Sequence, residues 1–407
     1  MTIGRIGGVI ERECGLEMIL ASPRDLPPRT ASFDEVGDLE QYLDAADVAV
    51  VGVLHAFKCG DVLDQLAEIK RRRGEDFVPT VLVLGGTDVN VDAGDKADVL
   101  TRRAHAVNTV VSFSASMITA APAGSLPSDG RTRVVPQGVN LPTDEEPVHL
   151  TDGDAEDANA PLPPPPPPPP LHEACGVPST TPVFLLPAGL RPVKDVLWAI
   201  DAIDAIGASS NSDPFVLAIL GPSLDDEYRD TVIERLKTSK HAVLIPPVDR
   251  AHTVGYMRAA AAVVNTSKSE GQSGAILEAA AAGVPIIARD IPGNRTLLDL
   301  LFDATGTETG GEECDLGEFE SQPDGFESHL EGFESHPCGV LCPTPESFAA
   351  ALASSAAGRE RRSTDRAALG AECLARGERD GWRDIIREVI GERPEGGCEP
   401  PDVAATA

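Results

Sequence analysis

A chain of 407 residues, 42% of them hydrophobic, is long enough for about two to three domains and apolar enough to bury a core in each. Its net charge of −31 repels nucleic acid and anionic membrane surfaces, so the sequence predicts neither kind of partner. No apolar run reaches the ~18 residues that a membrane-spanning helix needs. The eight cysteines form no CxxC pair and no metal knuckle, so we expect reduced thiols in a cytoplasmic protein.

Short Val-rich runs alternate with helical patterns in the first part of the chain. The runs begin at Asp47, Thr80, Asn108 and Thr132. A helical pattern over residues 59–72 separates the first two runs. Such runs, without polar alternation, are typical of strands buried on both faces of a parallel sheet. The pattern predicts an α/β domain over residues 1–140.

An acidic, proline-rich segment follows over residues 141–181, with eight acidic and no basic side chains. The prolines from Pro163 to Pro170 favour an exposed polyproline II rod, so we expect a semi-rigid linker. Residues 163–170 form a candidate docking site for a proline-reading domain, although proline-rich spacers without a partner are more common.

The alternation of strand and helix patterns restarts at residue 182. It predicts a second doubly wound, Rossmann-like sheet formed by residues 182–302 and 338–378. Between them, residues 303–337 hold eleven acidic and no basic side chains and three imperfect copies of a seven-residue FES repeat. A repeat this short and acidic cannot be buried, so we expect a surface insertion. Residues 379–407 close the chain with a helix and a tail.

Two such sheets joined by a linker leave a cleft at the carboxyl ends of their strands, where ligands of this fold class bind. The most informative segment runs from Asn265 to Asn294, where a strand pattern leads through Glu270 and a glycine-containing loop into a helix. Glycines at a helix N-terminus let free N–H groups approach a phosphate closely. Glu278, on the second helical turn, can accept hydrogen bonds from ribose hydroxyls. An N-capped helix with one buried acid would show the same pattern.

The E-x7-E spacing of Glu270 and Glu278 within SEGQSGAILEAAAAGVPIIARDIPGN resembles the donor-binding signature of the family 4 retaining glycosyltransferases, which have the GT-B fold. The segments LGGTDVNVDA, VVPQGVN, LPAGLRPVKD and CGVLCPTPESF extend the resemblance over nearly all of both domains. The resemblance implies retaining transfer of a sugar from a nucleotide-sugar donor to an unknown acceptor, without a metal or other cofactor. A sugar-nucleotide epimerase of the same fold and a catalytically silent sugar-nucleotide-binding or scaffold protein are the alternatives.

The resemblance assigns roles to individual residues of the second domain. Lys194 matches a lysine that neutralises the departing diphosphate. Arg191 is a second candidate, although the family's arginine usually stands well before the lysine. Glu270 matches a glutamate near the donor sugar, and Glu278 matches the ribose-binding glutamate. The loop that faces the diphosphate consists of Gly271, Gln272, Ser273 and Gly274.

Three residues at strand ends of the first domain are further candidates. His55 stands where related enzymes place a histidine near the donor sugar, although a lone histidine at a strand end is more often structural. Thr87 and Asp88 follow the next strand and either line the acceptor side of the cleft or form a polar turn. Asp152 and Asp154 resemble the metal-binding D-x-D of another glycosyltransferase class, but they lie in the acidic linker. We interpret that match as coincidence and expect no metal site.

The beginning of the chain departs from the family pattern. Family members start with a strand and a glycine-containing loop, whereas residues from Thr2 onward already have a helical pattern here. The sequence therefore predicts a first domain without its first strand. Two explanations account for the missing strand. Either the reading frame starts too late, or the protein is a truncated, inactive copy. Donor binding without efficient transfer is the consequence that we expect.

Overall fold

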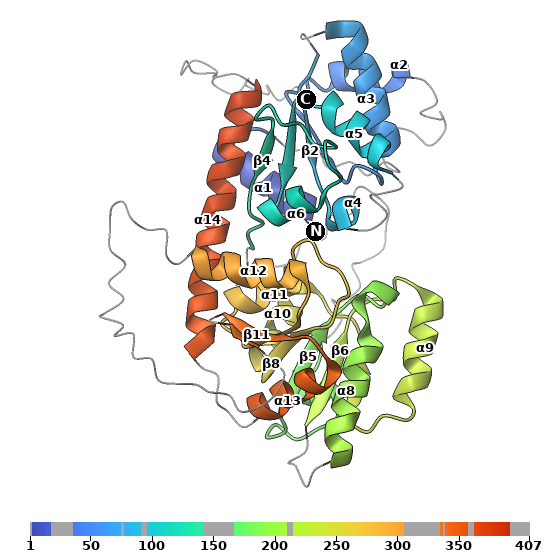
Figure 1. Cartoon of the computed structure of the whole chain (residues 1–407), viewed down its shortest axis with the longest axis vertical. Coiled ribbons are helices and arrows are strands. Elements are labelled where there is room, and N and C mark those ends of the chain that lie inside the picture. The colour runs from blue at the N-terminus through green and yellow to red at the C-terminus, as the bar shows by residue number, and fades with distance from the viewer. Residues whose placement is uncertain are drawn as a thin grey trace, which may run out of the picture. The chain divides into compact units, whose positions relative to one another are not determined.

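The computed structural model describes residues 2–17, 36–74, 77–90, 96–139, 141, 167–209, 215–304, 334–336, 338–356 and 362–390. The chain divides into two compact units (Figure 1). Unit 1 comprises Met1–Val135 with Glu378–Ala407, and unit 2 comprises Pro136–Gly377. Each unit contains a sheet of parallel strands covered by helices, which confirms the predicted α/β class with two Rossmann-like sheets.

Unit 1 is built on a four-stranded parallel sheet in the order β1-β2-β3-β4. Its strands are β1 (Val51–Leu54), β2 (Thr80–Val83), β3 (Thr109–Ser112) and β4 (Thr132–Val134). All four lie within the runs that the sequence predicted as strands. Every residue of β2 and β3 is buried, as expected for parallel strands with both faces covered.

In the described part of residues 2–120, six helices contribute to the core around this sheet. They are α1 (Thr2–Cys14), α2 (Val36–Ala45), α3 (Gly60–Arg73), α4 (Gly86–Asn90), α5 (Ala97–Ala106) and α6 (Ala115–Ala120). The helix predicted from Thr2 is confirmed as α1. In α3, Leu63, Leu66 and Ile69 recur every three residues and face the core of unit 1.

Unit 2 contains a seven-stranded sheet in the order β10-β11-β9-β8-β5-β6-β7, parallel except for β10. Its strands are β5 (Val183–Pro187), β6 (Val216–Leu220), β7 (Ala242–Ile245), β8 (Ala262–Asn265), β9 (Ile286–Arg289), β10 (Glu334–His336) and β11 (Gly339–Cys342). The chain adds β6 and β7 on one side of β5, and then crosses to add β8 and β9 on the other. Such a reversal leaves a crevice at the carboxyl ends of the two strands that flank it, β5 and β8.

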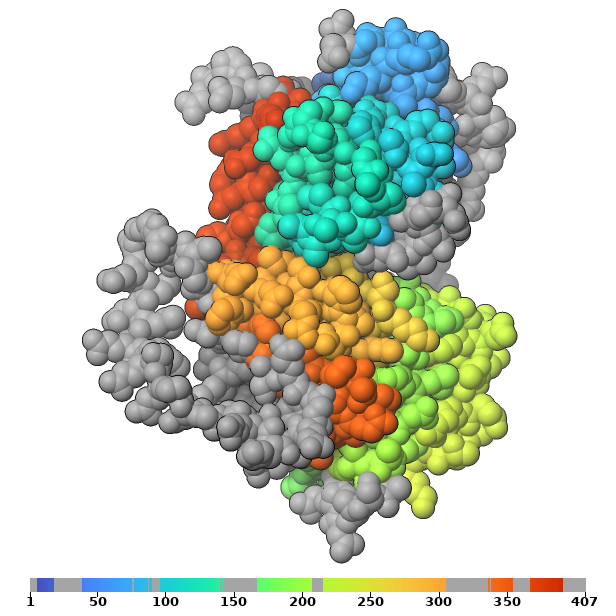
Figure 2. All heavy atoms as spheres, in the orientation of Figure 1, coloured from blue at the N-terminus to red at the C-terminus, as the bar shows by residue number. Residues whose placement is uncertain are grey.

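The side chains of this sheet alternate between its two faces. In β5, Val183 and Leu185 belong to one buried cluster, and Phe184 and Leu186 belong to another, because successive residues of a strand point to opposite faces. On the first face lie α10 (Arg250–Ala259), α11 (Gly274–Ala281) and α12 (Pro292–Asp303). On the second face lie α8 (Val196–Ser209), α9 (Asp226–Leu236) and α13 (Pro345–Ala356) (Figure 1). Figure 2 shows α9 (yellow-green) and α13 (orange-red) at the surface.

The long helix α14 (Arg362–Ile390) contributes to the cores of both units. Ala367 and Ala371 pack in the first cluster of unit 2, whereas Trp382 and Ile385 pack in the core of unit 1. The helix predicted around Trp382 is therefore confirmed.

The end of the predicted linker belongs to unit 2. Within residues 141–181, α7 (Leu171–Ala174) buries Leu171 in the core at 1% exposure. The hydroxyl of Tyr256 donates to the carbonyl of Pro169 at 2.7 Å. The expectation of an exposed linker is wrong for this part, because Leu171 and the apolar residues after it supply surface that the core covers. Pro163 to Pro166 lie outside the described residues.

The predicted insertion also contributes to unit 2. Glu334–His336, near the end of 303–337, form β10 and pair with β11. The ring of His336 contacts Phe302 edge-on. The earlier FES copies lie outside the described residues, as do Asp152 and Asp154 in the linker.

Candidate active site

The loops after β5 and β8 meet where the second sheet reverses its strand order. The loop after β5 contains a short 3-10 turn, Pro192–Lys194, and the loop after β8 carries Glu270. The N–H of Lys268 donates to the carbonyl of Val193 at 2.9 Å, and the hydroxyl of Thr266 donates to the carbonyl of Lys194 at 3.0 Å. These contacts tie the two loops together at the ligand-binding edge of the sheet.

Lys194 and Glu270 form the centre of this site. Nζ of Lys194 lies 2.5 Å from Oε1 of Glu270, and the two side chains are 19% and 12% exposed. The same oxygen accepts a hydrogen bond from the hydroxyl of Ser267 at 2.6 Å. The amide nitrogen of Asn265 lies 3.4 Å away. Charge-assisted hydrogen bonds to a carboxylate are shorter and stronger than neutral ones, so this network fixes the Glu270 carboxylate.

Asn265 and Ser267 were not among the predicted site residues. Asn265 is a buried polar residue at the carboxyl end of β8, and its amide also donates to the hydroxyl of Ser273 at 3.0 Å. Its carbonyl oxygen accepts from Asn294, 0% exposed, at 3.1 Å. Polar residues that directly follow a buried strand are the signal in the sequence that points to them.

The predicted phosphate loop leads into α11. Ser273 is buried, and its hydroxyl caps this helix at the N–H of Ile276. Gln272 accepts a hydrogen bond from the N–H of Gln137 at 3.0 Å through its side-chain oxygen. Gly274 is exposed at the first turn of the helix, where free N–H groups and the helix dipole favour an anion.

Glu278 lies on α11 and pairs with Arg250. Its Oε1 accepts from Nε of Arg250 at 2.9 Å, and the glutamate side chain is 13% exposed. Arg250 is the first residue of α10 and was not predicted as a site residue, because one arginine at a helix start is an ordinary pattern. The pair fixes the carboxylate that the resemblance assigns to the ribose.

Arg191 lies between Leu190 and the short turn that ends at Lys194. Its Nε is buried and has no hydrogen-bond partner within the described part of the chain. A buried nitrogen of this kind requires an explanation, because desolvation without a compensating hydrogen bond costs free energy.

A hollow of about 310 Å³ lies beyond this loop, at the carboxyl ends of β6 and β7. Its lining is mainly apolar, with Leu190, Leu244, Ile245 and Pro246 among it, and it includes the polar side chains of Ser223 and Arg229. A mainly apolar slot with few polar groups is suited to a flat aromatic ring.

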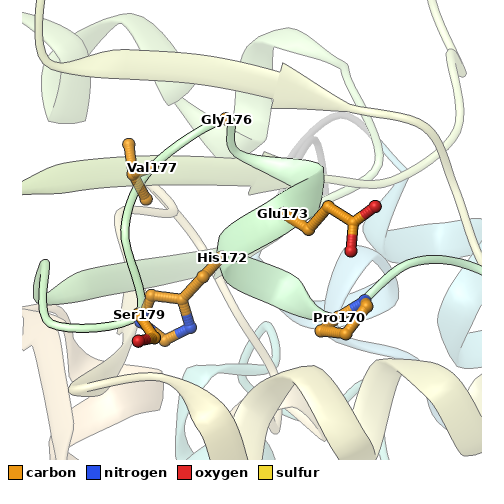
Figure 3. Close-up of a pocket in the computed structure, with 6 residues that line it drawn as sticks. All are labelled: Pro170, His172, Glu173, Gly176, Val177 and Ser179. Carbon is orange, nitrogen blue, oxygen red and sulfur yellow. The ribbon is translucent and has the colours of Figure 1, made fainter.

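A larger hollow of about 460 Å³ lies against α7 (Figure 3). It is lined by Pro170, His172, Glu173, Gly176, Val177 and Ser179. Glu173 and Ser179 are exposed, and the Nε2 atom of His172 lies 3.1 Å from the carbonyl oxygen of Thr181. None of the predicted site residues lines this hollow, and it offers no buried polar group. We therefore place the candidate active site at the strand reversal.

In unit 1, His55 and Asp88 lie together. His55 follows β1 with a left-handed backbone, φ 73°, and its Nδ1 lies 3.4 Å from Oδ2 of Asp88. Asp88 is 1% exposed, and the same oxygen accepts from the N–H of Ala56 at 3.1 Å and of Gly85 at 2.8 Å. The buried carboxylate thus joins the loops after β1 and β2, which favours the polar-turn alternative. Thr87 lies in α4, and its side chain is outside the described residues.

No group of three or more His, Cys, Asp or Glu side chains within the described ranges could hold a metal ion. The metal-free reaction stays a prediction. None of the helices that the structure describes combines the length and the apolar character needed to cross a membrane.

Residues 181–306 match the protein family described as Glycosyl transferases group 1. The matched residues all lie in unit 2. Over 259 residues, 63% of this chain and 69% of the relative, the sequence is 28% identical to Glycosyltransferase 1 domain-containing protein 1 of Xenopus tropicalis. Over 129 residues, 30% of each chain, it is 29% identical to D-inositol 3-phosphate glycosyltransferase of Jonesia denitrificans.

Solved glycosyltransferase structures have the same GT-B fold. HepE of Anabaena in complex with UDP has a TM-score of 0.57 and 14% identity, with coverage of 87% of this chain and 82% of HepE. A glycosyltransferase of Rickettsia africae has a TM-score of 0.57 and 13% identity, with coverage of 93% and 85%. At these identities the likeness concerns the fold alone, so the reaction is argued from the site.

Proposed function

We propose that the protein is a retaining glycosyltransferase that transfers a sugar from a nucleotide-sugar donor to an acceptor without a metal ion. The observation that carries the proposal is the junction of Lys194 and Glu270 at the strand reversal of a group 1 glycosyl transferase domain. The same junction lies beside the N-terminus of α11 and beside Arg191.

The charges around the junction suit a diphosphate. Lys194 supplies an ammonium group, and the first turn of α11 supplies free N–H groups. An oxygen of the diphosphate would satisfy the buried Nε of Arg191. Negative charge grows on the diphosphate as the bond to the sugar breaks, so these fixed groups stabilise the transition state more than the bound donor.

The remaining groups of the site bind the nucleoside and the sugar of the donor. Glu278, fixed by Arg250, accepts hydrogen bonds from the ribose hydroxyls, and the hollow at the ends of β6 and β7 takes the base. Glu270, fixed by Ser267 and Asn265, binds the donor sugar. HepE has been solved with UDP and with UDP-glucose, so uridine nucleotides are the first donors to test.

A thermal-shift panel of nucleoside diphosphates and their sugars tests the donor class. A ligand at ~100 times its dissociation constant adds about 2.7 kcal/mol of stability, so one base should raise the melting temperature clearly. The matching nucleoside monophosphate is the control, because it lacks the phosphate that Lys194 would bind. Absence of a shift with every diphosphate would exclude the proposed donor site.

Turnover separates the transferase from its alternatives. The bound donor should release its nucleoside diphosphate when a panel of sugar and peptide acceptors is added, and the product should keep the anomeric configuration of the donor. Conversion of the donor into a second sugar nucleotide would show an epimerase. Binding without any reaction would show a silent sugar-nucleotide-binding protein.

A further inference from the structure

Asp195 directly follows Lys194 and has an unusual backbone. Its φ of 46° and ψ of 48° lie in the left-handed region, which side chains with a Cβ atom rarely adopt. Its N–H donates to the carbonyl of Pro192 and closes the 3-10 turn, and its carbonyl accepts from the N–H of Trp198 in α8. The chain therefore turns sharply between the residue that carries the ammonium group and the next helix.

The side chain of Asp195 is held by two cations, one at the end of β9 and one in the loop after β8. Its Oδ2 lies 2.8 Å from Nη1 of Arg289, the last residue of β9, and its Oδ1 lies 3.5 Å from Nζ of Lys268. The carboxylate is only 15% exposed. The guanidinium of Arg289 stacks on the ring of Trp198, with its central carbon 5.1 Å from the ring centroid.

These contacts restrain the backbone on either side of the Lys194–Asp195 peptide bond. Thr266 holds the carbonyl of Lys194, while Arg289 holds the side chain of the residue after it. Arg289 lies at the end of β9 and packs on Trp198 of α8, so it ties the loop that carries Asp195 to the sheet. A rigid support of this kind is what an electrostatic site needs, because a displacement of the charged group weakens its action.

We propose that Asp195 and Arg289 are positioning residues that fix the ammonium group of Lys194 on the donor diphosphate. The inference rests on the proposed function, because it assigns Lys194 to the diphosphate. Asp195 acts through two properties. Its left-handed backbone sets the direction of Lys194, and its ion pair with Arg289 holds that backbone in place.

The negative charge of Asp195 makes the sign of the change in diphosphate affinity a test of the proposal. A nearby carboxylate repels a diphosphate, so its removal strengthens binding if Asp195 has no positioning role. If Asp195 positions Lys194, removal weakens binding. The two explanations therefore predict opposite signs for the same substitution.

The experiment is a double-mutant cycle measured by titration calorimetry with UDP and GDP as probes. Asp195→Gly removes the carboxylate, and glycine adopts the left-handed backbone of this position readily. We expect about tenfold weaker binding of the preferred diphosphate, and no further loss when the same change is made in Lys194→Ala protein. Asp195→Asn, which keeps an acceptor for Arg289 and tolerates the backbone, should restore most of the affinity. Arg289→Met should repeat the loss without altering residue 195.

Two outcomes overturn the positioning role. They are stronger binding by Asp195→Gly, and an equal loss in the presence and absence of Lys194. If the unaltered protein binds neither probe nor any other nucleoside diphosphate, the proposed function itself falls, and the inference falls with it. Melting curves of each variant show whether the fold is kept. If Asp195→Gly fails to fold, the diphosphate affinities of Arg289→Met and Asp195→Asn provide the same comparison.

Discussion

Lys194 and Glu270 lie 76 positions apart in the chain and are joined by an ion pair of 2.5 Å. One comes from the loop after β5 and the other from the loop after β8, the two strands that flank the reversal of the second sheet. Each group restrains the other at the edge of the sheet where ligands of this fold bind. Under the proposed function, a donor diphosphate would compete with Glu270 for the ammonium group of Lys194.

Lys194→Ala should lower kcat by about 100-fold to 1000-fold and weaken donor binding much less, because the positive charge matters most when the diphosphate leaves. Steady-state kinetics with the preferred donor measure both terms. Lys237→Ala, which removes an exposed lysine paired with Glu234, is the matched control and should change neither. A loss of donor affinity with kcat unchanged would give Lys194 a binding role only.

Glu278→Gln should remove most of the donor-induced thermal shift and leave the free protein folded. The amide keeps an acceptor for Arg250 but loses the charge to which the proposed function assigns the two ribose hydroxyls. Glu234→Gln, at a 74% exposed side chain of the same unit, is the control. The assignment of Glu278 to the ribose is wrong if the shift of the variant equals that of the unaltered protein.

Turnover should survive 10-fold excess EDTA over any added metal, as expected for a site in which Lys194, Arg191 and a helix N-terminus provide the positive charge. Initial rates before and after chelation measure this. Loss of activity on chelation, with recovery on addition of Mg²⁺ or Mn²⁺, would show that the reaction needs a metal ion.

Asp88→Ala should destabilise unit 1 by about 2 kcal/mol, because it leaves the buried N–H groups of Ala56 and Gly85 without their acceptor. Urea unfolding followed by circular dichroism gives the free energy. Glu68→Ala removes an exposed carboxylate from the same unit and should change the free energy of unfolding much less. Similar losses for both variants would show that the buried contacts of Asp88 contribute little.

Cys175 should react slowly with iodoacetamide. Burial raises the pKa of its thiol to about 11 from 9.0, because desolvation disfavours the thiolate. At pH 8 the thiolate fraction should then be about 100-fold below that of an unperturbed cysteine. Mass spectrometry of the labelled peptide measures the rate in folded and urea-unfolded protein. A folded rate equal to the unfolded one would show that residues 171–177 do not stay packed on unit 2.

The resemblance in the sequence pointed to Lys194 and Glu278 as candidate site residues, but not to the arginines that the structure places beside them. Arg250 binds Glu278 across 28 positions, and Arg289 binds Asp195 across 94 positions. Neither arginine stands in a distinctive local pattern. For the linker, the acidic and proline-rich composition predicted an exposed segment, whereas Leu171 is buried. Its burial depends on contacts with the core of unit 2, which the local composition does not show.

By itself, the sequence determined the α/β class, most strands of both sheets, and the loop and helix from Glu270 to Glu278. These are local properties, since a buried parallel strand is a short apolar run and a phosphate loop is a run of small residues before a helix. Only the tertiary structure decided which side chains meet. The order of strands in the second sheet brings the ends of β5, β8 and β9 together, and hence Lys194, Glu270 and Arg289. That order follows from the packing of helices on both faces, which no local pattern encodes.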